Sequence, residues 1–522
     1  MLRVFQNDLL DPERFVVTLE LVPGRESTGR SVDAVIGIAK DAFADGRISA
    51  VSITDNPGGN PSLSPDAIGY RIFSLGMDVI VHFTCRDMNR VGMESRALQL
   101  AMMGMKNILA LTGDYSGKGF GGQGAPVFDL DSVNLQILFT LISQRMQNAG
   151  DPDGFFTGCA VSPFKSTEGE CMAQYAKMSR KVAAGARFII TQLGYDARKF
   201  QELIGVQRHM DLDVPTLGSV YVLSPGAAAV MHQGKVPGAV VSDRLLRTVQ
   251  NEWRDRKNGR RFSIERAARL AAVLRGLGYR GIHIGGIHSD FSTVGLILDR
   301  MEQIKDDWRE FLADFKHPQA GGFYAFREIP PQPVKTPVFG TKVSRPSIPE
   351  RLLYTTLRRS HALFFDRRSR LAPLYRAACR AMDGHRAGRL LVHFFEHPLK
   401  RMLLGCLQCG DCAIQHVGFL CPESGCPKHT RNGACGGSLQ GMCEVHPDRQ
   451  CIWFRAHNRL APHKKTEELC TSCVPPRMWE LNNTSSWLNF HLDRDHQNNG
   501  REIADFCRQT VCRLVPAGKG DS

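Results

Sequence analysis

The chain has 522 residues, of which 43% are hydrophobic and 23% are charged, and its formal net charge is +14. A chain of this length can bury a large core and is expected to form two or three domains. No apolar run approaches the ~18 residues that a bilayer-spanning helix needs, and residues 1–8 lack the apolar core of a secretory signal. The composition therefore argues against a membrane-spanning protein, and we expect a soluble, cytoplasmic one.

Short β-rich runs recur along the first 300 residues, and a loop and a helical pattern follow each of them. The eight runs are 15–22, 48–54, 78–84, 107–112, 155–161, 188–192, 216–220 and 281–285. Helices are expected over 32–43, 89–103, 130–146 and 172–184, and residues 227–277 are expected to hold two more. Strands that alternate with helices in this way predict an α/β fold, a (β/α)8 TIM barrel. A doubly wound open sheet is the alternative, but no Gly-x-Gly-x-x-Gly follows the first run.

Polar residues stand at the ends of seven of the eight runs. In a (β/α)8 barrel the carboxyl ends of the strands form the active face. One polar residue in a strand usually satisfies a neighbour, but seven strands that end this way indicate a shared ligand site. The residues include Glu20, Thr54, His82, Thr84, Asp114, Gln192 and His283.

A proline-rich stretch, 330–337, follows the barrel pattern and predicts a linker. Residues 341–402 come next and carry 14 Lys and Arg against four Asp and Glu, a net charge of +10. We expect this segment to be helical. Its charge indicates either a solvated helical face or a docking patch for an acidic partner, such as a ferredoxin-like protein or a polyglutamate tail. Nucleic acid is not expected, because no aromatic interleaving or known binding motif accompanies the charge.

Ten of the sixteen cysteines lie between residues 406 and 473, while the first 400 residues hold four. In a reducing compartment such crowding indicates metal ligands or redox groups rather than disulfides. The Cys-x2-Cys-x2-Cys spacing at the start of the block is similar to iron–sulfur ferredoxin runs. Zinc is the alternative, and His416, His429 and His446 could join it. The ligand candidates are Cys406, Cys409, Cys412, Cys421, Cys426, Cys435, Cys443, Cys451, Cys470 and Cys473.

The strand-end sequences resemble the methylenetetrahydrofolate reductase family, which is a flavin-dependent (β/α)8 barrel. The resemblance covers residues 10–305 and rests on the segments 19–23, 51–54, 81–85, 109–114 and 181–192, the last of which ends in Thr-Gln. Residues 400–475 resemble the cysteine-rich partner subunit, or fused C-terminal domain, that accompanies this reductase in some anaerobic one-carbon pathways. That second resemblance rests on 405–412, 421–428, 431–437 and 451–453.

The resemblance implies that reduced FAD gives a hydride from N5 to 5,10-methylenetetrahydrofolate, which yields 5-methyltetrahydrofolate. Glu20 is then the acid that assists ring opening at N10, and we expect desolvation to raise its pKa. Asp114 is implied to lie near flavin and pterin, where it tunes the ring system, and Gln192 to bind the pterin edge. The implied flavin contacts are Thr54, His82, Thr84, Asp114 and Lys181.

The sequence departs from the family pattern at two places, and the second bears on the electron donor. Thr112 stands where the family often has Arg, and residues 162–168 lack the usual Tyr-Pro-Glu-x-His-Pro-Glu. In relatives that loop touches the flavin and the nicotinamide donor. The donor is therefore either NAD(P)H or an acidic electron-carrier protein such as ferredoxin.

The sequence also leaves alternatives for function and assembly. A methyl-tetrahydrofolate-dependent methyltransferase barrel and a noncatalytic assembly subunit are the competing functions, and a homo-oligomer or a larger complex is expected. The expected domains are the barrel at 1–325, the linker at 326–341, the basic helical segment at 342–402 and the cysteine-rich metal-binding domain at 403–515.

Overall fold

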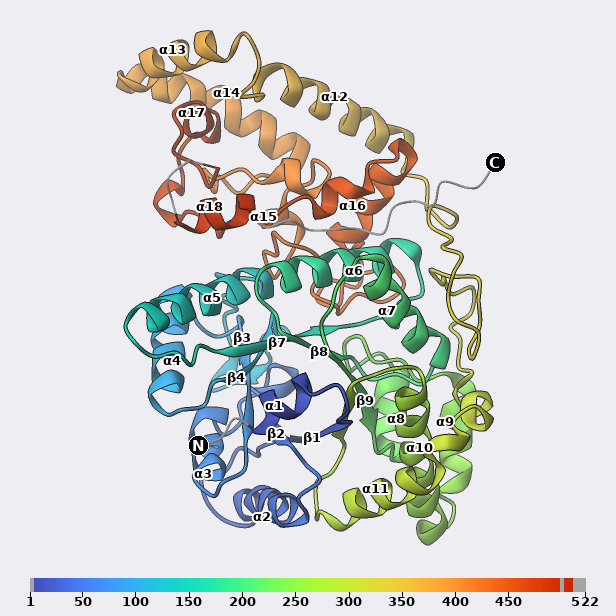
Figure 1. The fold of residues 1–522 in the computed structure, drawn as a ribbon. Coiled ribbons are helices and arrows are strands. Elements are labelled where there is room, and N and C mark those ends of the chain that lie inside the picture. The colour runs from blue at the N-terminus through green and yellow to red at the C-terminus, as the bar shows by residue number, and fades with distance from the viewer. Residues whose placement is uncertain (1–3, 498–501, 510–522) are drawn as a thin grey trace.

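The computed structural model describes residues 4–497 and 502–509. Eight parallel strands close into a barrel in the order β1-β10-β9-β8-β7-β4-β3-β2 (Figure 1). They are β1 Val16–Leu21, β2 Ala50–Ile53, β3 Val79–Thr84, β4 Asn107–Leu111, β7 Phe156–Val161, β8 Phe188–Thr191, β9 Thr216–Tyr221 and β10 Gly281–Gly285. All eight predicted runs form strands, and the predicted (β/α)8 TIM barrel is confirmed.

The barrel is closed at one end by aromatic packing. Phe5 lies in the short helix α1 (Val4–Leu10), and its ring meets those of Phe156 and Phe188 edge-on, with centroids 5.9 and 5.2 Å away. The strands themselves are buried on both faces, as in β3, where all six residues are buried. Such strands suit a parallel barrel that is covered by helices outside and filled by side chains inside. The apolar floor leaves the opposite end, where the strands finish, as the open mouth.

Helices surround the barrel: α2 Arg30–Asp45, α3 Pro65–Phe73, α4 Arg90–Met102, α5 Ser132–Asn148, α6 Glu168–Ala183, α7 Ala197–His209 and α11 Ser292–Ile304. Three helices, α8 Pro225–His232, α9 Asp243–Glu252 and α10 Arg256–Gly276, occupy the segment for which the sequence predicted two. The prediction was wrong because Ser224, Ser242 and Asp255 each cap a separate helix start. A small hairpin, β5 Lys118–Gly119 with β6 Gly122–Gln123, was not expected.

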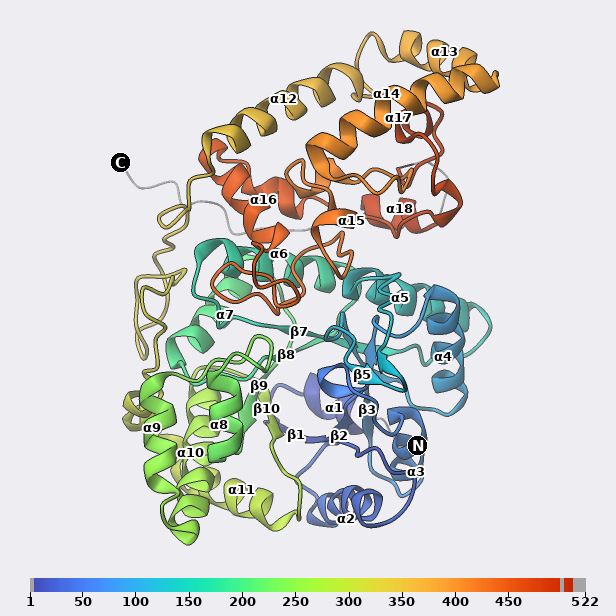
Figure 2. The same ribbon diagram turned by 180° about the vertical axis from the view of Figure 1, so that it is seen from behind.

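Residues 348–497 and 502–509 form a second layer above α5 and α6 (Figures 1 and 2). The basic segment is helical, as predicted, in α12 Ile348–Phe364, α13 Ala372–Asp383 and α14 Arg386–Leu404. Short helices α15 Pro422–Gly425, α16 Ile452–Leu460, α17 Ser486–His491 and α18 Glu502–Gln509 hold the loops of the cysteine-rich part. Ala173 of α6 packs in the same apolar cluster as Trp453 of α16. The cysteine-rich part therefore packs directly on a barrel helix.

Among residues 4–497 and 502–509, no helix combines the length and the hydropathy needed to cross a bilayer.

Candidate active site

A cavity of about 390 Å³ opens at the carboxyl ends of the barrel strands. It is lined by all seven barrel residues that the sequence singled out for catalysis or binding: Glu20, Thr54, His82, Thr84, Asp114, Lys181 and Gln192. The structure therefore brings these residues together at one site, although they come from strands β1 and β3, helix α6 and the loops that follow β2, β4 and β8.

Glu20 faces a histidine from the last strand. Its Oε2 lies 3.8 Å from Nε2 of His283, because β1 and β10 are neighbours in the closed barrel. The other ring nitrogen, Nδ1, lies 2.8 Å from the Thr18 hydroxyl, which donates in turn to the Ile282 carbonyl at 3.3 Å. Because the Thr18 hydroxyl donates its only proton to Ile282, its oxygen can act only as an acceptor toward His283, and Nδ1 therefore carries a proton. Nε2 is then the nitrogen that can exchange a proton with Glu20.

The expected rise in the pKa of Glu20 is wrong. Burial does raise this pKa, but the hydrogen bond and the charge of His283, with the charges of His82 and His288, outweigh burial, and the pKa lies below its ordinary value. The sequence could show the desolvated carboxyl but not the imidazole that barrel closure brings beside it. Burial lowers the pKa of His82 to about 4, so this ring is neutral at physiological pH.

Two buried polar atoms at the cavity have no hydrogen-bond partner: Thr54 Oγ1 and His82 Nε2. Both residues line the cavity and both were predicted to contact a flavin. Buried polar groups are nearly always paired, so an orphaned donor or acceptor needs an explanation. A polar ring system in the cavity would supply one, and these residues therefore fit a bound flavin.

Asp114 is held at the cavity by its neighbours. Its Oδ2 accepts from the backbone N–H of Gly58, which follows β2, at 2.9 Å. The preceding Gly113 has φ +90°, and a Cβ there would lie 3.0 Å from Thr84 Cβ. Glycine therefore both permits the left-handed turn and leaves room for strand β3.

Lys181 and Gln192 also line the cavity and are already hydrogen-bonded to backbone. Lys181 Nζ donates to the Ala160 carbonyl at 2.6 Å, and burial lowers its pKa to about 8. Gln192 donates through Nε2 to the Pro237 carbonyl at 2.8 Å and accepts from the Leu193 N–H at 2.8 Å. A ligand that binds Gln192 must therefore share or replace these bonds.

The cysteine-rich part also contributes to the cavity lining, which the sequence analysis missed. Its contributors are Lys428, Cys435, Gly436, Gly437 and Glu444. Lys428 Nζ pairs with Glu444 Oε1 at 2.5 Å and donates to the Gly113 carbonyl at 2.7 Å. From the barrel side, Lys165 Nζ donates to the Gly436 carbonyl at 2.6 Å. Residues 428–444 thus form part of the roof over the barrel mouth, a contact between distant segments that no local motif indicates.

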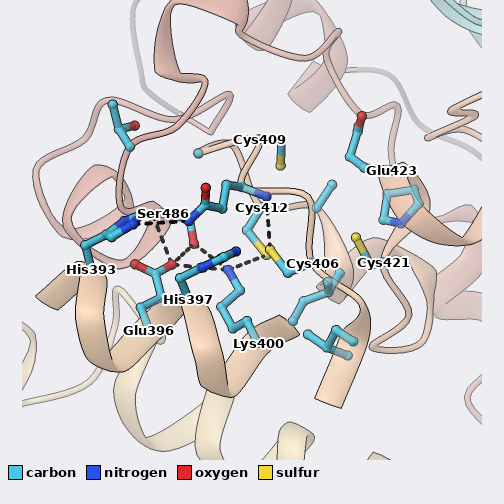
Figure 3. A pocket seen from close by; sticks show the side chains of 17 residues that line it. His393, Glu396, His397, Lys400, Cys406, Cys409, Cys412, Cys421, Glu423 and Ser486 are labelled. Carbon is cyan, nitrogen blue, oxygen red and sulfur yellow. Dashed lines mark hydrogen bonds and ion pairs between the residues drawn. The ribbon is translucent and has the colours of Figure 1, made fainter. Parts of the chain in front are cut away.

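Cys406, Cys409, Cys412 and Cys421, here called the outer quartet, line a pocket beside α14 (Figure 3). α14 turns His393, Glu396, His397 and Lys400 toward this pocket. Lys400 Nζ lies 3.6 Å from Cys412 Sγ, 3.3 Å from Glu396 and 2.6 Å from the Ser486 hydroxyl. Burial raises the pKa of Cys406, Cys409 and Cys421, and the Lys400 ammonium partly offsets the rise at Cys406.

Cys426, Cys435, Cys443 and Cys451, here called the inner quartet, interact electrostatically with one another. Burial raises the pKa of Cys435 to about 12, and the adjacent Glu444 carboxylate adds to the rise. Because Cys435 also lines the barrel cavity, the inner quartet borders the candidate active site. Cys470 and Cys473 lie elsewhere, with their sulfurs 3.4 and 4.0 Å from the Ala176 and Arg180 carbonyls of α6.

The spacing of the sulfurs tests which metal group would fit. A tetrahedral Zn²⁺ with Zn–S bonds of about 2.3 Å needs its sulfurs about 3.8 Å apart. In the described part of the chain, no three cysteine sulfurs lie within 4.8 Å of one another, whereas Glu20, His82 and His283 do have ligand atoms that close. His416 and His429, possible zinc ligands, instead contact His496 and the Glu423 carbonyl. As placed, the sulfurs of neither quartet therefore meet the spacing of a single zinc ion.

Comparisons with known proteins agree on one family. The family model described as "Methylenetetrahydrofolate reductase" matches residues 6–301, and "Methylene-tetrahydrofolate reductase C terminal" matches 387–480. Methylenetetrahydrofolate reductase 1 of Schizosaccharomyces pombe is 23% identical over 55% of this chain and 46% of its own length. Methylenetetrahydrofolate reductase 2 of Saccharomyces cerevisiae is 30% identical over 34% of this chain and 29% of its own.

These matches are partial. The chain spans less than half the length of these curated relatives. Among solved structures, a Clostridium thermocellum protein described as binding two copies of 5-methyl-5,6,7,8-tetrahydrofolic acid shows 12% identity and a TM-score of 0.39 over 58% of this chain and 99% of its own. A likeness of that size carries no argument about the ligand of this chain.

Proposed function

Because the chain belongs to the methylenetetrahydrofolate reductase family, we propose that it reduces 5,10-methylenetetrahydrofolate to 5-methyltetrahydrofolate with FAD as cofactor. The observation that carries the proposal is the single cavity lined by all seven predicted residues, with orphaned polar atoms on Thr54 and His82. Bound FADH2 would supply the hydride from N5. Thr54, His82, Thr84 and Lys181 would hold the flavin, Asp114 would face flavin and pterin, and Gln192 would bind the pterin edge.

The proton for ring opening at N10 would come from Glu20. A carboxyl whose pKa is held low is seldom protonated on its own near neutral pH, so it needs a proton source. Nε2 of His283, 3.8 Å away, is placed to supply that proton, while Thr18 fixes the ring. In this scheme Glu20 is the acid that touches the substrate, and His283 is the residue that protonates Glu20 again.

The two quartets would hold iron–sulfur clusters and feed single electrons to the flavin. The outer quartet lies at α14 and the inner quartet at the cavity, which gives an order for the transfer. The electron donor remains one of two, NAD(P)H or an acidic carrier protein such as ferredoxin. Zinc at these quartets would be structural, because it has no redox chemistry.

The proposal retains the predicted division into barrel, linker, basic helical segment and cysteine-rich domain. Residues 510–515 of the last domain lie outside the described residues. It also retains a cytoplasmic location and a homo-oligomer or larger complex.

The visible spectrum of anaerobically purified protein tests the proposal. We expect the two-banded spectrum of an oxidised flavin, with a broad shoulder that dithionite bleaches. A protein that takes up no flavin on reconstitution would favour a methyltransferase barrel, and a flavoprotein that turns over no folate with any donor would favour an assembly subunit. Either result would overturn the proposed reductase.

A further inference from the structure

The helices α12, α13 and α14, here called the basic helical layer, expose an unusual amount of apolar surface. Of 30 large apolar side chains that are exposed in the described ranges, 14 lie between residues 348 and 407. They include Phe394 and Met402 of α14, at 72% and 77% exposure. Contiguous apolar surface on a soluble protein usually marks a binding site.

The helix α14 buries a largely polar face and exposes an apolar one, which is the opposite of the usual arrangement in a surface helix. His393, Glu396, Lys400 and Leu404 follow the i, i+3, i+7, i+11 spacing of one helix face and line the outer quartet (Figure 3). The other side carries Leu391, Phe394, Phe395, Leu399 and Met402, all of them exposed. One helix diameter, about 10–12 Å, therefore separates the exposed apolar side of α14 from the cysteines.

The charge on this layer is positive and turned outward. Three of its four carboxylates are engaged with other parts of the protein: Glu350 with Arg459, Asp383 with Arg494, and Glu396 with the hydroxyls of Ser485 and Ser486. Arg386, Arg389 and Arg401 of α14 are exposed. An apolar centre with a basic surround is complementary to a protein with an acidic rim.

We propose that the outer face of α12, α13 and α14 is the docking surface for an acidic iron–sulfur electron-carrier protein, which delivers electrons to the outer quartet. This inference rests on the proposed function, since it assumes that the quartet holds a redox cluster. Two reduced carriers each give one electron per cycle, and two protons from solvent complete the reduction of methylene- to methyl-tetrahydrofolate. Each carrier leaves oxidised by one electron.

The alternatives fit the surface less well. A second copy of this chain in a symmetric contact would place one face of net charge +10 against another. An anionic lipid surface would match both the charge and the apolar side chains. A lipid, however, gives no reason for the outer quartet to lie directly beneath the face, with Leu407, between two of its cysteines, 57% exposed.

The test compares two electron donors on the full-length, cluster-loaded protein. Reduced two-[4Fe–4S] ferredoxin needs a docking site, whereas methyl viologen, a small dye, does not. Arg401→Glu and Phe394→Ser should each lower kcat/KM for ferredoxin about tenfold and leave the methyl viologen rate unchanged. Matched changes on the barrel, Arg256→Glu on α10 and Leu296→Ser on α11, should change neither rate.

Each other outcome has a defined meaning. Ferredoxin rates that do not respond to Arg401→Glu or Phe394→Ser would overturn the docking surface while methyl viologen turnover still supports the reductase. If the unaltered protein reduces no folate with methyl viologen as the donor, the proposed function itself would be overturned. A dimer that Phe394→Ser dissociates in light scattering, or flotation with phosphatidylserine vesicles that Phe394→Ser abolishes, would assign the face to another occupant and overturn the inference.

Discussion

Glu20 Oε2 and His283 Nε2 lie 3.8 Å apart where the first and last strands of the barrel meet. This contact lowers the pKa of Glu20 against the effect of burial. We therefore predict that Glu20→Gln abolishes folate reduction, with a loss of about 10²–10⁴-fold, the usual contribution of a general acid. Flavin reduction, measured by bleaching of the flavin absorbance in stopped flow, should be largely unaffected. Near wild-type turnover in this variant would show that another group is the acid.

The pH dependence should respond to His283 in a defined direction. His283→Asn removes the hydrogen bond and the charge that lower the Glu20 pKa, while burial, which raises it, remains. The Glu20 pKa should therefore rise. Because Glu20 must be protonated to act as the acid, the alkaline limb of the kcat/KM profile for folate should move to higher pH. Thr18→Ser, which keeps the hydroxyl beside Nδ1, is the matched control and should leave the profile in place. A profile that does not move in His283→Asn would remove this histidine from the proton path.

Much of the barrel site could be predicted from sequence because it depends on local pattern. Apolar runs such as 79–81 specify buried strands, and polar residues at the carboxyl end of a barrel strand lie at the mouth. The sign of the Glu20 pKa could not be predicted, since it depends on closure of β1 against β10. Nor could the roof formed by Lys428 and Glu444, or the separation of the cysteines into two quartets, because these depend on how loops distant in sequence pack together.

The roof contact gives a prediction for stability. Lys428 is 3% exposed and pairs with Glu444, so Lys428→Met leaves a buried carboxylate without its partner. Breaking a buried pair in this way costs about 3–5 kcal/mol of unfolding free energy. The double variant Lys428→Met with Glu444→Gln should recover part of the loss in thermal unfolding. If Lys428→Met alone unfolds like the wild type, the pair does not hold the cysteine-rich part on the barrel.

The two quartets should be separable by spectroscopy. Cys409→Ser removes a ligand of the outer quartet and Cys435→Ser one of the inner quartet, so each variant should lose about half of the cluster iron and one of two sets of EPR signals. Flavin content serves as the control for Cys409→Ser, because Cys409 lies outside the barrel cavity whereas Cys435 lines it. Equal metal content with zinc in place of iron would show that the sites are structural.

Lys400 should raise the reduction potential of a cluster at the outer quartet. Its buried ammonium lies 3.6 Å from Cys412 Sγ and would stabilise the added electron. Lys400→Met should therefore make the cluster harder to reduce, by roughly 60 mV if the effect on the equilibrium is tenfold for one electron. EPR-monitored redox titration measures this directly and does not depend on turnover. Arg401→Met removes the neighbouring but exposed charge and is the matched control, for which solvent screening predicts a much smaller shift. Equal shifts in the two variants would mean that net surface charge, and not the buried ammonium at Cys412, sets the potential.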